Sequence, residues 1–179
     1  MVLVACPVDT PVGRRDLAIL TVLVQLALRA GEVASLQLED IQWRAGTVSV
    51  RGAKSHRQRL LPLSDEVGTA LVKYLRDGRP HSDHRAVFLT ARAPHRPLSP
   101  SAISTCAARA MERAGVSAAR HGSHVFRHTA ATRMLRAGAT FKDIADVLGH
   151  ARLETTGIYA KLDLEALARV ALPWPEVAP

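Results

Sequence analysis

Apolar positions along the chain follow two different periods, and this difference predicts its elements. Residues 14–28 are densely apolar, with Gln25 as an interruption in the later part, which predicts a buried helix. Gly31 then allows a turn, and residues 32–38 predict a short second helix.

The period changes to two in the next segment. Residues 47–51 alternate and are rich in β-branched side chains, as expected of a strand. Residues 52–56 make a polar turn and residues 57–63 read as the return strand of a hairpin. Residues 86–90 are a further apolar segment and predict the third strand of a small antiparallel sheet.

The remainder of the chain predicts helices, several of them opened by a hydroxyl side chain that can cap the first turn. The expected helices cover residues 65–77, 100–114, 123–137 and 141–148, a short segment around Tyr159, and residues 163–172. The predicted fold class is therefore α+β, mainly α, with a three-stranded antiparallel sheet near the N-terminal half. A length of 179 residues favours one domain, over residues 13–179, after a tail or linker remnant at 1–12.

Composition adds a preference for an anionic partner. Lys and Arg number 24 against 16 Asp and Glu, a net charge of +8 with a pI near 10.5. Such a balance favours polyanions, because each contact with a phosphate releases condensed counterions. Charge alone leaves a merely basic soluble protein as an equal alternative.

Two function classes are disfavoured by composition. Cys6 and Cys106 are too few and too far apart in sequence for a disulfide framework or a zinc site. No apolar run approaches the roughly 18 residues of a membrane span. We therefore expect a cytoplasmic protein with no membrane partner.

Several polar residues together could cleave a phosphodiester without a metal. That reaction needs fixed donors for the phosphate oxygens, a nucleophile and a proton for the departing alkoxide. Arginine, tyrosine and lysine or histidine suit these three tasks. The candidates are Arg29, expected in a buried setting at the end of the first helix, Lys54 in the hairpin turn, His124 and Arg127 on one helix face, His150 after Gly149, and Tyr159.

Each candidate also has a plain structural explanation, such as a helix cap for His150 or a packed aromatic side chain for Tyr159. Arg29 could be a buried partner of Glu32, and His124 with His128 could form half of a metal site that no cysteine cluster or well-placed carboxylate completes. The cationic hairpin residues Lys54, Arg57 and Arg59 could be a solvated edge that prevents strand pairing. Together these explanations would require five coincidences.

The order of the motifs resembles the tyrosine recombinase (phage integrase) family. The matching elements are Leu-Arg-x-x-Glu at 28–32, a lysine in a basic hairpin, His-x-x-Arg-His at 124–128, Leu-Gly-His at 148–150, and a tyrosine nine residues later. The resemblance spans residues 14–172. It implies the integrase-type DNA breaking–rejoining fold and site-specific DNA recombination.

The resemblance also implies which residues handle the phosphate. Arg29 and Arg127 resemble the two arginines that clamp the scissile phosphate, and His150 resembles its third donor. Tyr159 resembles the nucleophile that forms a 3′-phosphotyrosyl intermediate. Because that bond conserves the phosphodiester energy, the family requires neither ATP nor metal, and no cofactor is expected.

Proton transfer and support are implied for four further residues. Lys54 resembles the general acid for the leaving 5′-hydroxyl, and His124 resembles the acid–base histidine that helps the nucleophile lose its proton. Glu32 is expected to buttress the first arginine, and His128 to orient the active-site helix. One departure from the family pattern is Ala27, where a glycine is frequent, which we expect to be tolerated inside a helix.

The expected partners are double-stranded DNA and further copies of the chain. The family implies a homotetramer on paired sites, a monomer without DNA, association with the nucleoid when bound, and exchange of the helix at 163–172 between protomers. Residues 1–12 cannot supply the family's usual N-terminal core-binding domain, so we expect weak autonomous binding. Two alternatives stay open: a type IB topoisomerase-like DNA-relaxing enzyme, and a non-catalytic DNA-binding remnant of a mobile element.

Overall fold

The computed structural model describes residues 2–3, 6–52, 58–116 and 122–149. The chain divides into two compact units, residues 1–130 and 131–179. The first unit contains α1 to α4, the sheet and the start of α5, and the second contains the end of α5 and α6.

The central helix of the first unit is α1, Pro11–Gln25. It begins where the hydroxyl of Thr10 accepts the backbone N–H of Gly13 at 3.0 Å, with proline in the first helical position. The middle of α1 is buried on every side, as its dense apolar run predicts. Its end differs from the prediction, because the helix stops at Gln25 and Ala27 adopts a left-handed conformation with φ of 52°.

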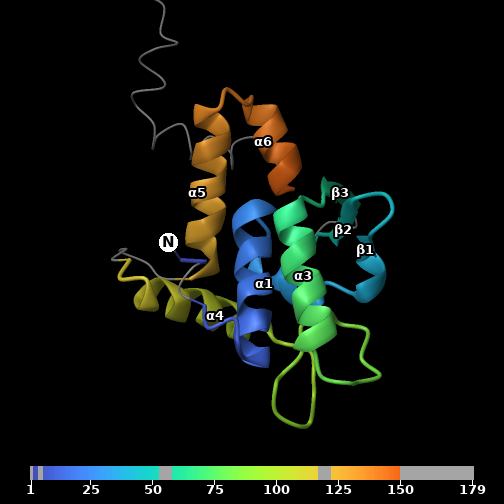
Figure 1. The fold of residues 1–179 in the computed structure, drawn as a ribbon. Coiled ribbons are helices and arrows are strands. Elements are labelled where there is room, and N and C mark those ends of the chain that lie inside the picture. The colour runs from blue at the N-terminus through green and yellow to red at the C-terminus, as the bar shows by residue number, and fades with distance from the viewer. Residues whose placement is uncertain (1, 4–5, 53–57, 117–121, 150–179) are drawn as a thin grey trace, which may run out of the picture. The chain divides into compact units, whose positions relative to one another are not determined.

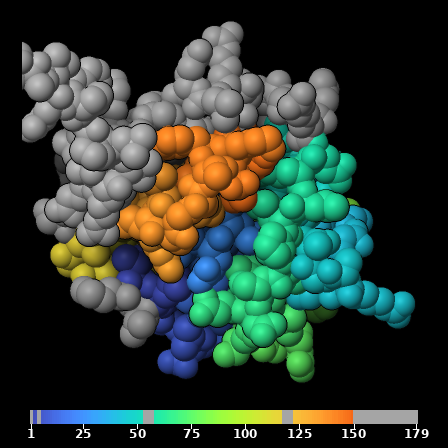
Figure 2. All heavy atoms as spheres, turned by 90° about the horizontal axis from the view of Figure 1, so that it is seen from above, coloured from blue at the N-terminus to red at the C-terminus, as the bar shows by residue number. Residues whose placement is uncertain are grey.

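Two amphipathic helices pack against α1. Helix α3, Asp65–Asp77, lies along it and is capped by Ser64, whose hydroxyl accepts the N–H of Val67 (Figure 1). The space-filling view shows the two helices in contact, α1 in blue and α3 in green (Figure 2). Helix α4, Pro100–Arg113, is capped by Ser99 and packs against α1 and against α2, Ala30–Ser35. The caps predicted at both serines are confirmed.

The sheet has three antiparallel strands in the order β1, β2, β3. After the short 3₁₀ helix η1, Leu38–Asp40, come β1, Ile41–Gln42, then β2, Thr47–Arg51, and β3, Gln58–Pro62. The register places Val48 opposite Leu61 and Val50 opposite Arg59. The predicted hairpin is therefore present, and side chains at alternate positions of β3 face the same side.

The third strand was expected at residues 86–90, and this prediction is wrong. That segment makes only the isolated bridges Gln37–Ala86 and Leu89–Pro97, while Ile41–Gln42 completes the sheet. Val87, Phe88 and Leu89 are all fully buried, so the run is apolar because it fills the core and not because it joins a sheet. Two residues of β1 are too few to show alternation.

The last described helices begin as expected. Helix α5 covers Ser123–Arg136, and α6 covers Phe141–Leu148 with the predicted capping box, in which Thr140 and Asp143 bond each other's backbone N–H. Within the described residues, no helix is both long and apolar enough to cross a membrane. The helices expected around Tyr159 and at 163–172 lie outside the described residues.

A candidate active site around a buried glutamate

The centre of the candidate site is Glu32 in the first turn of α2. Its side chain is 1% exposed, and one carboxylate oxygen accepts the backbone N–H of Arg29 at 2.8 Å. Arg29 is the N-cap of this helix, so the carboxylate closes the helix start as an acidic side chain does near a positive helix end. The left-handed Ala27 turns the chain between α1 and α2 and so brings Arg29 to this position.

A second arginine reaches the same carboxylate from the sheet. Arg59 on β3 donates from Nη1 to Oε1 and from Nη2 to Oε2 of Glu32, each at 3.0 Å. Its side chain is 13% exposed, because position 59 shares a face of the strand with the buried Leu61. The interpretation of the hairpin cations as a solvated edge is therefore wrong for Arg59.

The two arginines expected to bind phosphate also meet at Glu32. Arg29 donates from Nη1 to Oε1 at 3.2 Å, and Nη1 of Arg127 lies 4.0 Å from Oε2. Arg127 also donates to the carbonyl of Ala27 at 2.7 Å. The backbone turn and the glutamate thus bring together two arginines that are far apart in sequence.

The two arginines differ in their exposure to solvent. The side chain of Arg29 is 44% exposed, whereas that of Arg127 is 8% exposed. The expected buried setting of Arg29 is therefore wrong. The residue follows the end of α1 and caps the start of α2, which leaves nearly half of its side chain in solvent.

The charges in this cluster favour an anionic ligand. Burial by itself raises the pKa of Glu32, but the hydrogen bonds from Arg59 and from the backbone of Arg29, with the charges of both arginines, hold it below its ordinary value. Glu32 is therefore ionised at neutral pH. Three guanidinium groups and one carboxylate give these four side chains a net charge of +2, suited to a phosphate.

Both candidate histidines lie on α5 with Arg127. His124 is exposed in the first turn, which the Ser123 and Ser104 hydroxyls link to α4 at 3.1 Å. One turn later His128 is also exposed, and its pKa is lowered by partial burial and by the charges of His124 and Arg127. His128 is therefore largely neutral at physiological pH and able to accept a proton.

Three of the eight predicted site residues meet at the carboxylate of Glu32. Two more lie on α5, the helix that carries one of these three. Arg29, Glu32 and Arg127 form the cluster, with His124 and His128 on α5. Lys54, His150 and Tyr159 lie outside the described residues. Over the described ranges no three His, Cys, Asp or Glu side chains are grouped to hold a metal ion.

Arg59 is the member of this cluster that the sequence presented as a hairpin cation and did not predict as a site residue. Its contact with Glu32 joins residues 27 positions apart, which no local pattern reveals. The available signal was strand alternation, because Arg59 and the apolar Leu61 occupy the same face of the predicted return strand.

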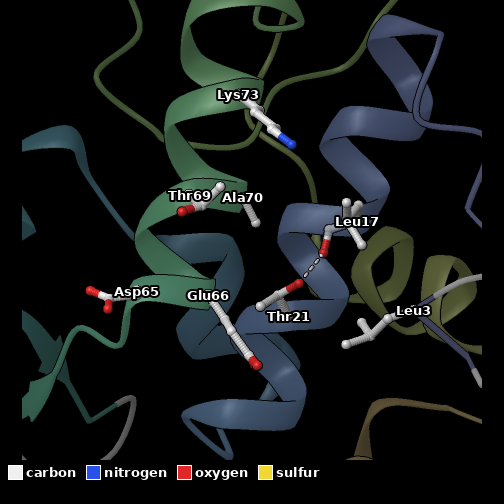
Figure 3. A pocket seen from close by; sticks show the side chains of 8 residues that line it. All are labelled: Leu3, Leu17, Thr21, Asp65, Glu66, Thr69, Ala70 and Lys73. Carbon is white, nitrogen blue, oxygen red and sulfur yellow. Dashed lines mark hydrogen bonds between the residues drawn. The ribbon is translucent and has the colours of Figure 1, made fainter.

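A polar hollow and a shallower one border the described part of the first unit. A polar one of about 340 Å³ lies beside the cluster and is lined by Glu32, Asp40, Ser49 and Arg51 among others. A shallower one of about 430 Å³ lies between α1 and α3, where Thr21 donates to the carbonyl of Leu17 at 2.8 Å (Figure 3). The polar hollow adjoins the cluster that gathers the predicted site residues.

Comparison by sequence gives the same family along most of the chain. The Phage integrase family profile matches residues 3–165. The putative integrase/recombinase y4rA of Sinorhizobium fredii is 46% identical over 93% of this chain and 41% of its own length. The putative integrase/recombinase y4gC of the same organism is 43% identical over 93% of this chain and 86% of its own length. The chain thus spans less than half of the first relative and most of the second.

Comparison by structure gives the same fold. The crystal structure of XerA recombinase superposes with a TM-score of 0.76 at 31% identity, over 88% of this chain and 57% of that one. XerH site-specific recombinase, bound to a palindromic difH substrate in a post-cleavage complex, gives 0.79 at 22% identity. That match covers 98% of this chain and 51% of the XerH chain, and at such identity it concerns the fold alone.

Proposed function

Because the chain belongs to the phage integrase family, we propose that it cuts and rejoins double-stranded DNA at specific sites. The observation that carries this proposal is the meeting of Arg29 and Arg127 at Glu32. These arginines come from the two most separated motifs within the described residues, and their charges suit one phosphodiester. The net charge of +8 supports DNA as the partner.

The proposed reaction is a transesterification. The oxygen of Tyr159 attacks the scissile phosphorus, the bond from phosphorus to the 5′-oxygen breaks, and a 3′-phosphotyrosyl bond forms. His124 accepts the phenolic proton and Lys54 gives a proton to the departing 5′-oxygen. Attack by a 5′-hydroxyl reverses these steps, so bond energy is conserved and neither ATP nor a metal is needed.

The proposed role of the arginines follows from electrostatics. Negative charge grows on the non-bridging oxygens as the fifth bond to phosphorus forms, and preorganised cations stabilise it more than they stabilise the substrate. Glu32 supports this arrangement because it holds the backbone and the side chain of Arg29 at once. His150 would add a third donor, and His128 would hold α5 in orientation.

The assembly is proposed by analogy with the family. Recombination between two sites requires four strand cleavages, so a homotetramer on paired sites is the functional unit, with a monomer in the absence of DNA. The segment at 163–172 would join neighbouring protomers. The XerH complex with difH DNA supports the same kind of partner for this chain.

Covalent capture on a nicked suicide duplex tests this function. The nick lets a short fragment dissociate after cleavage, so that the protein–DNA bond persists and survives denaturing electrophoresis. We expect an adduct with the wild-type chain at low salt and none with Tyr159→Phe, which lacks only the nucleophilic oxygen. DNA binding without an adduct would instead support a non-catalytic remnant, and an adduct with Tyr159→Phe would identify another nucleophile.

A further inference from the structure

The hairpin and the arginine pair share one carboxylate. Arg59 contacts both oxygens of Glu32 from β3, and Arg29 contacts the same two oxygens from α2 with its Nη1 and its backbone N–H. Each oxygen that holds Arg29 therefore also holds Arg59. A rotation of the carboxylate would disturb both arginines together.

The contact between Arg59 and Glu32 is built to fix orientation. Two parallel bonds of 3.0 Å keep the carboxylate in the plane of the guanidinium, which a single bond does not. Both side chains are almost removed from solvent, at 13% and 1% exposure. Nε of Arg59 is buried and donates to no acceptor in the described ranges, so the pair with Glu32 is what orients this guanidinium.

This pairing has a consequence for the other two arginines. Arg59 bonds both oxygens of Glu32 in the plane of the carboxylate. Arg29 therefore donates to this carboxylate from one terminal nitrogen, and 44% of its side chain is exposed to solvent. Nη1 of Arg127 stays 4.0 Å from Oε2, beyond a normal hydrogen bond. Without the fork of Arg59, the buried carboxylate would gain by turning toward Arg29 and Arg127.

We infer that Arg59 is a positioning residue that keeps Glu32 away from full pairing with Arg29 and Arg127, so that these two can bind the scissile phosphate. The inference rests on the proposed function and deepens it. Arg59 itself does not contact DNA, because both of its terminal nitrogens are directed at Glu32. Its role is in the chemical step and not in DNA affinity.

Arg59→Lys is the variant that tests this role. Lysine retains the charge but cannot form the two-pronged contact. We expect the rate of adduct formation at saturating suicide DNA to fall about 10- to 100-fold, the range for misplacement of a reacting group by about 1 Å. DNA affinity should stay at the wild-type value, and Arg51→Lys, on the neighbouring strand with a 69% exposed side chain, should leave the rate unchanged.

A modified substrate separates the phosphate from the leaving group. When sulfur replaces the scissile 5′-oxygen, the thiolate departs without a proton, and a general acid becomes unnecessary. The arginines still face the same non-bridging oxygens. We therefore expect the defect of Arg59→Lys to be equally large on the sulfur substrate, whereas Lys54→Ala should be rescued by it.

Three outcomes would overturn the inference. Rescue of Arg59→Lys by sulfur would mean that the residue acts on leaving-group protonation through the hairpin. A wild-type rate would mean that the contact has no role in chemistry, and a rate loss matching the unfolded fraction in a thermal melt would mean a role in folding alone. The proposed function fails separately, if the wild-type chain forms no adduct on either substrate.

Discussion

Two arginine–carboxylate pairs hold the hairpin to the rest of the first unit, one on each strand, and they differ in burial. Arg59 of β3 pairs with Glu32, and Arg51 of β2 pairs with Asp40. The shortest nitrogen–oxygen distance is 3.0 Å in both pairs. The first arginine is 13% exposed and makes two bonds, while the second is 69% exposed and makes one. Distance alone would rank the pairs as equal.

Solvent decides what each pair contributes. Pairs that are exposed on both sides contribute about 0–1 kcal/mol, and the pair of Arg51 is exposed on the arginine side while Asp40 is 7% exposed. A buried partner cannot be rehydrated, and removing one member leaves an uncompensated charge that costs about 3–5 kcal/mol. The first pair should therefore hold the site together, and the second should matter little.

Removal of Glu32 is expected to have the largest effect. Glu32→Ala leaves Arg59 and Arg127, at 13% and 8% exposure, beside an empty position. The free energy of unfolding should fall by about 3–5 kcal/mol, measured by urea denaturation. Asp40→Ala is the matched control and should cost less, about 1 kcal/mol, because it loses chiefly the cap on the N–H of Gln37. Equal losses would contradict the distinction.

Removing the arginine of each pair, instead of the carboxylate, tests the same comparison. Arg59→Ala should lower the free energy of unfolding by about 3 kcal/mol, since the buried carboxylate of Glu32 loses two charged hydrogen bonds and keeps those from Arg29. Arg51→Ala should lower it by less, about 1 kcal/mol, because Arg51 makes one bond from solvent and the buried Asp40 keeps the backbone N–H of Gln37. The same urea titrations measure both variants, and a larger loss for Arg51→Ala would reverse the proposed order.

Acid should weaken the buried pair. The folded pKa of Glu32 lies below its value in the unfolded chain, so its contribution is fully present above a pH of about 4.5 and is lost as pH falls through the folded pKa. The difference in unfolding free energy between wild type and Glu32→Gln should therefore shrink at acid pH. The control is Glu112→Gln on α4, whose side chain is exposed, and its difference from wild type should stay the same across this pH range. A pH-independent difference would exclude titration of Glu32 as its source.

The smallest expected effect concerns the turn that carries Arg29. Ala27 is fully buried with φ of 52°, a conformation that costs alanine about 1 kcal/mol and glycine almost nothing. Ala27→Gly relieves this strain but loses a buried methyl group of similar value. The two terms oppose each other, so the free energy of unfolding, measured by thermal denaturation, should change by less than about 1 kcal/mol. A loss above about 2 kcal/mol would mean that the methyl packing dominates.

Local features of this fold were predictable, and features that depend on distant contacts were not. The caps at Ser64, Ser99 and Thr140 follow from side chains that bond neighbours three residues away. The end of α1 was misjudged because apolar residues continue past Gln25 through the buried turn. For the same reason Ala27 was expected in a helix, where it would carry no strain.

The candidate site shows the same division. Arg29, Glu32 and Arg127 were found because they belong to motifs whose order resembles a family, and the structure brings the three together. Arg59 lies in the basic hairpin, where the family motif points to the lysine alone, and its contact depends on how the sheet packs beside α2. Whether a charged strand residue is buried depends on tertiary packing. The alternation of the sequence indicates only which strand residues share a face.

The central claim is that Arg29, held by Glu32, neutralises charge on the scissile phosphate. It is tested most directly by comparing cleavage of a normal phosphodiester with cleavage of a methylphosphonate, in which an uncharged methyl group replaces one non-bridging oxygen. Arg29→Ala should slow single-turnover cleavage of the phosphodiester by about 100-fold or more, as loss of one oxyanion donor does. We predict that this defect largely disappears on the methylphosphonate, where the reacting phosphorus centre carries one negative charge fewer. An equal defect on both substrates would contradict the account.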